Sequence, residues 1–361
     1  MKQTSLFVQY VSKFFSGVVA AIVNKINDSK NPLVYYHKRF LKKQYSPDGK
    51  WESITAANTL VMADVVAMDS SLPLKKRDSI SRASGDIPKM GMEMALREKQ
   101  LTDLRTLALR PETEAQLITR IFNDVPRVIG GVYERNEAIF LEALSTGVAE
   151  ITDTENVGTS IRLDYGYLSA NQSGVATVWS STSATPLDDL QGVWNNAKNA
   201  GNIIQKWLMD RATFNSFAKT TQVKEYYAFS VGFAGTASQI PSLSKVNEFL
   251  KDTFGFTIEI IERSVRYEKN GVQTVATPWA TGIVIGICSE ELGLLQWARL
   301  AEADFPVEGV TYQTADEYIL VSKYRSNQPS LAEWTSSQSR VVPVLTNVDQ
   351  IYKIDSTEVE G

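Results

Sequence analysis

The sequence predicts an α+β protein that carries an extended N-terminal arm and a long projecting hairpin. Helix and strand signals are mixed from residue 186 to residue 354, which is typical of an α+β domain. Polar, turn-rich segments at 27–58 and 69–87 separate short apolar runs, and one helical pattern extends over 111–146. The extended elements have no obvious place within one chain to bury their apolar faces, so the sequence indicates a protein that packs against other protein.

The composition is that of an ordinary globular protein. The chain has 361 residues, of which 43% are hydrophobic and 22% are charged, enough for two or three domains. Its net charge of -4 argues against a strongly basic nucleic-acid-binding protein, although local basic patches are compatible with it. Charge therefore identifies no partner.

Residue types that carry catalysis or bind metals are scarce. Cys288 is the one cysteine and His37 the one histidine, so a disulfide framework, a Cys/His metal site and a Ser-His-Asp arrangement all lack support. Cys288 ends the apolar run GIVIGIC and is predicted to be a small buried residue of a strand. His37 lies in the basic and aromatic run YYHKRFLKK and is predicted to be a surface or interface residue. We predict no catalytic residue, cofactor or metal, and no pair of carboxylates stands out.

The first apolar segment, residues 5–26, predicts an amphipathic helix. At about 100° per residue, one face collects Phe7, Val11, Phe14, Phe15, Val18 and Ile22. Lys13 interrupts the run, which disfavours both a membrane span and a signal sequence. We expect the helix to dock on protein, and a signal sequence cleaved near Ala21 or a helix on a membrane surface are the alternatives.

An arm and a hairpin are predicted next. Residues 27–58 contain the turn signals NDSKNP and YSPDGK and should form an extended arm. The apolar runs 59–68 and 88–98 should pair as a hairpin. Its basic tip contains Lys75, Lys76, Arg77 and Arg82. The tip is either a solvated loop, a contact with an acidic domain of a neighbour, or a contact with DNA.

The second run of the hairpin has the two-residue period of a strand with one apolar face. Met90, Met92 and Met94 form that face. Because an isolated hairpin is at best marginally stable, the methionines should pack on other protein. This is either the core of the same chain or, in the interpretation we favour, a neighbouring subunit, since methionine adapts to varied surroundings.

A long helix is predicted over 111–146. Pro111 suits its first turn, and Gly147 suits its end. Pro126 removes an internal hydrogen bond and Gly130-Gly131 lowers the helix propensity, so we expect a kink between them.

The rest of the chain predicts short strands and well-signalled helices. Strands are expected at 159–168, 202–210, 256–267, 272–276, 281–288 and 317–325, with a closing strand over 339–354. Asn270-Gly271 is a hairpin turn signal, and Pro343 should lie at an edge or a bulge.

Three helices have start or stop signals. They are expected from Pro186 after the cap Thr185, from Arg211 after the cap Asp210, and over 242–254 before Gly255. Asp188 and Asp189 are explained by their place at a helix start, not by catalysis or metal binding.

Six segments, in this order, carry a family resemblance: PKMGMEMALREKQL, RNEAIFLEALSTG, TPLDDL, NIIQKWLMDRATFNSF, KNGVQTVATPWATGIVIGIC and EWTSSQSRVVPVLTNVDQIYKI. With the arm, the hairpin and the kinked helix, this order resembles the major capsid proteins of tailed bacteriophages with the Hong Kong 97-type fold. More specifically, it resembles the lambda-type (major capsid protein E) group. The resemblance covers nearly the whole chain beyond residue 45.

The resemblance implies a domain plan for this α+β chain. The expected parts are an N-terminal arm with the amphipathic helix (1–58), an E-loop hairpin (59–98), a P-domain (99–184 and 305–334) with a kinked spine helix at about 111–147, an A-domain with a central β-sheet (185–304 and 335–356), and a C-terminal tail (357–361).

The resemblance also implies a function. We expect a structural protein, not an enzyme, that self-assembles into hexamers and pentamers of an icosahedral shell enclosing double-stranded DNA. The implied partners are further copies of the chain, portal, scaffold and decoration proteins, and DNA bound without sequence preference; no membrane is involved. The implied location is the virion, after assembly in the host cytoplasm. The alternatives are the shell of a cellular nanocompartment of the same fold and a carboxylate-dependent hydrolase.

Two sets of residues are then expected at contacts between subunits. The E-loop set is Lys75, Lys76, Arg77, Arg82, Met90, Met92 and Met94, and the N-arm set is Phe7, Val11, Phe14, Val18 and Ile22.

Overall fold

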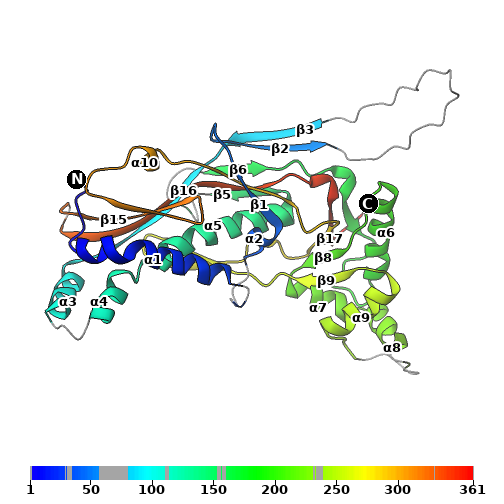
Figure 1. Cartoon of the computed structure of the whole chain (residues 1–361). Helices are drawn as coiled ribbons and strands as arrows, with labels where there is room; N and C mark the ends of the chain where they lie inside the picture. The colour runs from blue at the N-terminus through cyan, green and yellow to red at the C-terminus, as the bar shows by residue number, and fades with distance from the viewer. Residues whose placement is uncertain are drawn as a thin grey trace, which may run out of the picture. The chain divides into compact units, whose positions relative to one another are not determined.

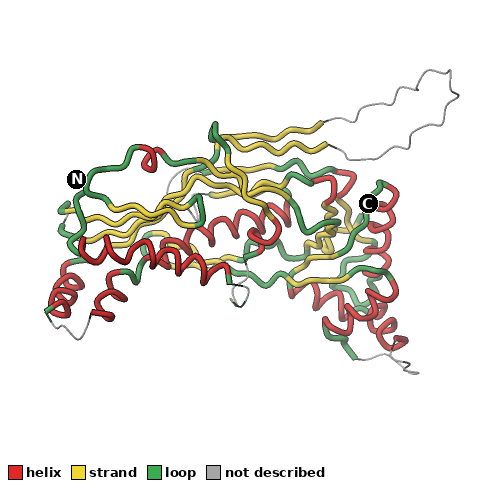
Figure 2. The backbone as a smooth tube through the Cα atoms, viewed as in Figure 1, coloured by secondary structure: helices red, strands yellow, loops and turns green. Residues whose placement is uncertain are grey.

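A computed structural model gives the fold of most of the chain. It describes residues 2–28, 30, 35–56, 80–109, 114–152, 156, 160–230, 232, 239–328 and 330–360, with only the backbone for 54–56 and 80–82. The described chain divides into two compact units. Unit 1 contains Met1–Trp51, Ser84–Glu137 and Leu294–Val344, and unit 2 contains Glu52–Ala83, Ala138–Gly293 and Leu345–Gly361. Figure 1 labels the elements and Figure 2 shows their types.

Unit 1 is built on a six-stranded sheet. Its elements are α1 (Val8–Asn27), α2 (Tyr36–Phe40), β1 (Leu41–Tyr45), β4 (Lys89–Leu96), α3 (Glu98–Ala108), α4 (Glu114–Ile121), β13 (Gly293–Ala298), α10 (Ala301–Asp304), β14 (Thr311–Ala315), β15 (Ile319–Ser326) and β16 (Ala332–Leu345). The strand order is β1-β13-β16-β15-β14, and β4 pairs with β16. β16 is antiparallel to both β15 and β4, so it forms the centre of the sheet.

Unit 2 has a five-stranded sheet covered by helices. Its elements are β5 (Val148–Ile151), β6 (Ile161–Asp164), η2 (Ser169–Asn171), β7 (Gln172–Val175), α6 (Pro186–Asn199), β8 (Lys206–Met209), α7 (Arg211–Lys219), α8 (Thr221–Ser230), α9 (Leu243–Thr253), β9 (Thr257–Ile260), β10 (Val265–Lys269), β11 (Val272–Ala276), β12 (Ile283–Ile287), η3 (Val348–Gln350) and β17 (Ile351–Val359). The sheet order is β7-β17-β12-β8-β9. The core joins buried side chains of α6, α7, α8 and α9 to those of the sheet, with Trp207 and Phe217 fully enclosed.

Several local predictions for unit 2 are confirmed. Asp210 caps α7, because its carboxylate accepts hydrogen bonds from the Ala212 and Thr213 amides. Gly255, at φ 79°, follows the end of α9, and Asn270 and Gly271, both at positive φ, form the turn between β10 and β11. These signals act within a few residues, which is why the sequence reveals them.

The predicted long helix is instead two helices. α4 ends at Ile121 and α5 (Val125–Thr146) begins four residues later, so the break precedes Pro126 and does not lie between Pro126 and the glycines. Pro126 occupies the first turn of α5, where its missing N–H costs nothing. Gly130 and Gly131 lie within the helix. The expected helix start at Pro111 lies outside the described residues.

The hairpin that the structure describes joins other strands than the predicted one. β2 (Lys50–Ala56) pairs with β3 (Ile80–Asp86), while the methionine strand β4 pairs with β16 in the sheet of unit 1. The run 59–68 lies outside the described residues. Alternation predicts a strand but not its partner. The expected closing strand over 339–354 is likewise two strands, β16 and β17, in different sheets.

The arm is less extended than expected. Residues 36–45, α2 and β1, form a segment that we call the strap, and β1 joins the sheet of unit 1. His37 is fully buried, so its prediction as a surface or interface residue was wrong. Cys288 is half-buried just beyond the end of β12, not within the strand as expected. The helix α3 had not been expected.

Candidate functional site

The N-terminal helix lies on its own chain. Val11, Phe15 and Val19, spaced four residues apart, are buried, and Phe15 stacks on Phe122 with ring centroids 6.1 Å apart. α1 contacts β14 of the same unit. The predicted stripe therefore contains two residues of this buried ridge, Val11 and Phe15, but not the third, Val19. Its members Phe7, Phe14, Val18 and Ile22 are half-buried and flank this ridge.

The residues before α1 are fixed to the sheet. Gln3 and Arg325 exchange two backbone hydrogen bonds of 2.9 Å each. The buried carboxylate of Glu333 accepts hydrogen bonds from the Ser5 hydroxyl and, at 3.0 Å, from the Leu6 amide. Burial raises the pKa of Glu333. A buried acceptor with two local donors holds this segment in a single position.

The methionine strand β4 places Met92 beside α5. Met90, Met92 and Met94 oppose Ser339, Ser337 and Thr335 in the register with β16. A side chain at Gly131 of α5 would collide with Met92, since an added Cβ would lie 2.3 Å from its sulfur. Met92 nevertheless stays 37% exposed. The methionine face therefore contacts its own chain and keeps accessible surface.

The structure describes only part of the basic tip. Lys75, Lys76 and Arg77 lie outside the described residues, and of Arg82 only the backbone, in β3, is described.

The strap is locked to α5 by a buried carboxylate. Glu137 accepts hydrogen bonds from the amides of Tyr36 at 2.8 Å and His37 at 3.1 Å, and its Oε2 lies 2.5 Å from His37 Nδ1. Both side chains are fully enclosed. The ring of His37 also lies near that of Tyr133, at 6.3 Å. Such a pair holds position strongly, because removing either partner leaves the other buried without compensation.

A second carboxylate, Asp316, binds the same strap. Its oxygens lie 2.9 Å from Lys38 Nζ and 2.8 Å from Lys43 Nζ, and it accepts a hydrogen bond of 2.8 Å from the Tyr133 hydroxyl. Burial alone would raise the pKa of Asp316, but the contacts with Lys43 and Lys38 outweigh it and hold that pKa below its ordinary value.

A buried lysine occupies the break between α4 and α5. Lys323 on β15 is fully enclosed, and its Nζ donates to the Ile121 carbonyl and to the Thr335 hydroxyl, both at 2.9 Å. Ile121 is the last residue of α4, so the ammonium group binds a carbonyl at the negative end of that helix. Burial lowers the pKa of Lys323 from 10.5 to about 8, although Glu333 and Asp124 oppose this. The one sequence feature that could have indicated this buried lysine is its place in a strand at a position where an apolar residue is expected.

The Asp189 carboxylate has a further structural role. It accepts hydrogen bonds from Trp179 Nε1 at 2.8 Å and from the Ala176 amide at 3.3 Å. The position of Asp189 at the start of α6 therefore explains only part of its role.

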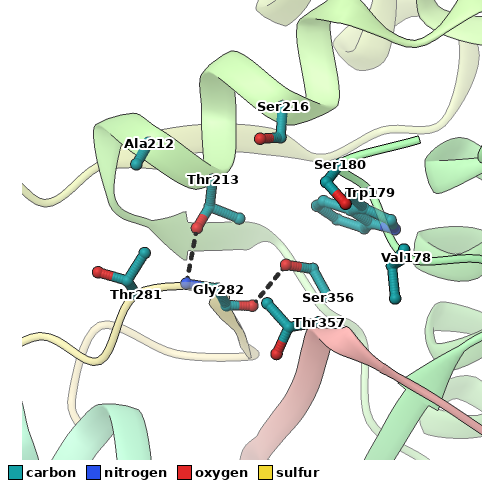
Figure 3. A pocket seen from close by; sticks show the side chains of 10 residues that line it. All are labelled: Val178, Trp179, Ser180, Ala212, Thr213, Ser216, Thr281, Gly282, Ser356 and Thr357. Atoms are coloured by element: carbon teal, nitrogen blue, oxygen red, sulfur yellow. Dashed lines mark hydrogen bonds between the residues drawn. The ribbon is translucent and has the colours of Figure 1, made fainter. Parts of the chain in front are cut away.

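The cavity in Figure 3 offers no catalytic group. Its volume is about 350 Å³, and its lining carries hydroxyl and apolar side chains. The Thr213 hydroxyl accepts a hydrogen bond from the Gly282 amide at 2.9 Å, and the Ser356 hydroxyl donates to the Gly282 carbonyl at 2.7 Å. The Thr213 hydroxyl also donates to the Asp210 carboxylate that caps α7, and the Thr357 hydroxyl donates to the Asp355 carboxylate at 2.6 Å. These hydroxyls thus take part in local structural hydrogen bonds.

Nucleophile and metal chemistry also lack a site in the part of the chain described. Burial raises the pKa of Cys288 to about 12, so its thiol stays protonated near neutral pH. No cluster of three metal-ligating side chains occurs among the described residues. None of the described helices combines the length and the apolar character needed to cross a bilayer.

Comparison with known proteins gives a consistent result. The family described as phage major capsid protein E matches residues 19–356. The crystal structure of a prophage protein of Escherichia coli CFT073, assigned as a capsid protein, is similar with a TM-score of 0.58 at 13% identity, covering 94% of this chain and 98% of that one. A phage-related protein of Bordetella bronchiseptica RB50 is similar with a TM-score of 0.51 at 10% identity, covering 99% and 98%. No curated protein sequence matches.

Proposed function

The chain belongs to the phage major capsid protein E family, and on this premise we propose that its copies assemble as hexamers and pentamers into an icosahedral shell that encloses double-stranded DNA. The observation that carries the proposal is the family match over residues 19–356. The Hong Kong 97-type fold predicted from the sequence is confirmed by the two solved structures. As a member of this family the chain is a structural protein of a capsid shell, not an enzyme.

We assign the parts of the chain as follows. The E-loop, expected at 59–98, is the β2–β3 hairpin with residues 57–79 between its strands, because β4 joins the sheet of unit 1. The P-domain, expected at 99–184 and 305–334, is centred on that sheet and on α5. The A-domain, expected at 185–304 and 335–356, is centred on the sheet of unit 2 and on α6 to α9, whereas β16 belongs with the P-domain.

The E-loop of each copy lies over the spine helix α5 and the P-domain of a neighbour. Met90, Met92 and Met94, and the half-buried flank of α1 (Phe7, Phe14, Val18 and Ile22), supply apolar surface for such contacts. The central residue Val11 is already buried in its own chain, so it supports the flank instead of touching a neighbour. The A-domains meet within each hexamer or pentamer. A stable contact of this kind buries about 800 Å² per partner.

Further partners follow from the same proposal. Portal, scaffold and decoration proteins complete the particle, which assembles in the host cytoplasm. Packaged DNA meets the inner surface through diffuse phosphate contacts that do not read its sequence. Because the net charge of the chain is -4, these contacts come from local basic patches.

Size-exclusion chromatography with negative-stain microscopy tests the proposal. We expect hollow closed particles of megadalton mass, and a monomer at all concentrations would contradict the assembly. Nuclease-protected DNA inside particles isolated from cells is the expected content. Protein cargo without DNA would favour a nanocompartment shell.

A variant in which residues 60–76 are replaced by a short Gly-Ser linker tests the E-loop. It should keep the circular dichroism spectrum of the folded subunit but fail to close shells. The control replaces the same number of residues with Gly and Ser at full length, which separates loop length from side-chain contacts. Normal shells from the shortened variant would refute the E-loop assignment.

A further inference from the structure

The cavity of unit 2 has the size of a small-molecule site and an uncharged lining. Its volume of about 350 Å³ lies within the range of ligand pockets, about 300–1,000 Å³. The lining residues Trp179, Gly282 and Ser356 are buried and form its inner part, whereas Thr281 and Thr357 are exposed and lie at its opening (Figure 3). None of the ten residues that line the cavity is charged.

Two hydroxyl groups of this lining donate their protons to carboxylates. The Thr213 hydroxyl donates to Asp210, and the Thr357 hydroxyl donates to Asp355 at 2.6 Å. Neither carboxylate belongs to the lining itself. A hydroxyl group has one proton and two lone pairs, so a hydroxyl whose proton is already used can only accept a further hydrogen bond.

Ser356 is in the same situation. Its hydroxyl donates to the Gly282 carbonyl at 2.7 Å, and a carbonyl can only accept, so the direction of this bond is certain. The Gly282 amide in turn donates to the Thr213 hydroxyl at 2.9 Å (Figure 3). Three hydroxyl oxygens of the lining, those of Thr213, Ser356 and Thr357, are therefore held as acceptors.

The two carboxylates leave their negative charge available to the cavity. Among the described residues, no lysine or arginine forms an ion pair with Asp210 or Asp355. Arg211, next to Asp210 in the chain, pairs with Glu262 instead. Each carboxylate accepts a proton from a lining hydroxyl, and such charge-assisted hydrogen bonds make that hydroxyl oxygen a stronger acceptor. The cavity therefore favours a ligand that donates hydrogen bonds and carries positive charge.

We propose that this cavity binds the end of an aliphatic chain that carries a primary ammonium group. The ammonium group has three N–H donors and no acceptor, which matches the lone pairs of Thr213, Ser356 and Thr357. Asp210 and Asp355 compensate its charge, and the alkyl chain packs on the methyl and ring atoms of the lining. An anion would meet acceptors and like charge. This inference goes beyond the proposed shell function and does not rest on it.

Saturation-transfer NMR on the full-length protein, which is applicable to free subunits and to assembled particles, tests the proposal. The probes are pentylamine, pentanol of the same shape without charge, and pentanoate of the opposite charge. Pentylamine should bind saturably and about fivefold more tightly than pentanol, and its affinity should fall as salt is added. Pentanoate should not bind.

Two further probes separate the sources of the ammonium group. Diaminobutane represents a free aliphatic amine, and lysine with both backbone ends blocked represents a side chain of another protein. Saturable binding of either one supports the site, and the tighter binder identifies the source. Binding of neither would overturn the inference.

Substitutions locate the binding site. Asp355→Asn and Asp210→Asn should each weaken pentylamine binding by about threefold to fivefold without changing pentanol binding, because asparagine keeps an acceptor for the hydroxyl but removes the charge. Asparagine also caps helices, so α7 keeps its start. The matched control is Asp252→Asn, at an exposed carboxylate of α9 in the same unit, which should leave the affinity unchanged. Ser216→Phe fills the cavity and should abolish binding.

The outcomes are decisive in both directions. Circular dichroism first verifies that each variant is folded, and where Ser216→Phe is not, the two asparagine variants at the cavity decide. Pentylamine affinity equal to that of pentanol would overturn the inference. Affinity unchanged in both Asp355→Asn and Asp210→Asn, or reduced equally by Asp252→Asn, would also overturn it, because binding would then not depend on this cavity.

Discussion

Replacing Lys323 with methionine should change how the stability of the subunit depends on pH. The side chain is fully enclosed, and burial lowers its pKa from 10.5 to about 8. Between these two values the unfolded chain holds a proton that the folded chain has released. The unfolded state then binds more protons, so the contribution of Lys323 to the free energy of unfolding rises with pH.

The magnitude follows from the two pKa values. Their difference corresponds to about 3 kcal/mol, at about 1.36 kcal/mol per pH unit. Below pH 8 the folded protein bears the full cost of the buried charge. Methionine has a similar length and no charge, so Lys323→Met removes this pH dependence.

Urea unfolding of wild type and variant between pH 7.5 and pH 10 provides the measurement. The wild-type free energy of unfolding minus that of Lys323→Met should rise by about 2–3 kcal/mol over this range. Groups that titrate equally in both proteins cancel in the difference. Lys251→Met, at an exposed position of α9, controls for the loss of a lysine and should give a flat difference.

The absolute difference at pH 7.5 is not diagnostic. Methionine leaves the Ile121 carbonyl and the Thr335 hydroxyl without their donor, which costs about 1–3 kcal/mol for each group and offsets the relief of the buried charge. The slope is the decisive quantity. A difference that stays flat, or that falls with pH, would show that Glu333 and Asp124 outweigh burial and would refute the reasoning.

Three further outcomes can be checked by urea or thermal unfolding. Glu137→Gln should lower the free energy of unfolding by about 1–3 kcal/mol, because it removes one acceptor oxygen from the buried contact that anchors the strap. Glu150→Gln, at an exposed carboxylate, should change it little, and equal effects of the two substitutions would contradict the anchoring. Gly91→Ala should lower the free energy of unfolding, since the added Cβ on β4 would lie 2.2 Å from a backbone oxygen of β16. Gly192→Ala, in open space within α6, should raise that free energy by about 0.5–1 kcal/mol. The reverse order of the two variants would refute the packing argument. Asp316→Asn should lower the free energy of unfolding at neutral pH, and the difference in this free energy from wild type should shrink as pH falls below about 4. The reason is that a carboxylate with a lowered pKa stabilises the fold above its unfolded pKa and loses this contribution in acid. A difference independent of pH would argue against the ion pairs.

The sequence predicted those features whose causes are local. Asp210 as a cap, Gly255 as a stop and Asn270-Gly271 as a turn each act within a few residues, and each is found where expected. The general resemblance of the ordered segments predicted the fold class and the family. The exact position of the helix break was missed, because Pro126 is tolerated in a first turn and the glycines fit within α5.

Long-range partners could not be read from the sequence. The alternation of β4 predicts a strand, but it does not identify β16 as the partner of that strand. His37 was predicted at the surface because its basic neighbours suggest solvent. Its burial depends on Glu137, one hundred residues away. Lys323 likewise owes its environment to Ile121 and Thr335, which no sequence window contains together.

The buried carboxylates of unit 1 explain why the N-terminal region is part of the fold. Glu333 binds the segment before α1, Glu137 binds the start of the strap, and Asp316 binds its lysines. Each anchor comes from a different element, β16, α5 or the turn between β14 and β15, so the N-terminal region is held at separated points. A segment held in this way to its own chain cannot extend far toward a neighbour.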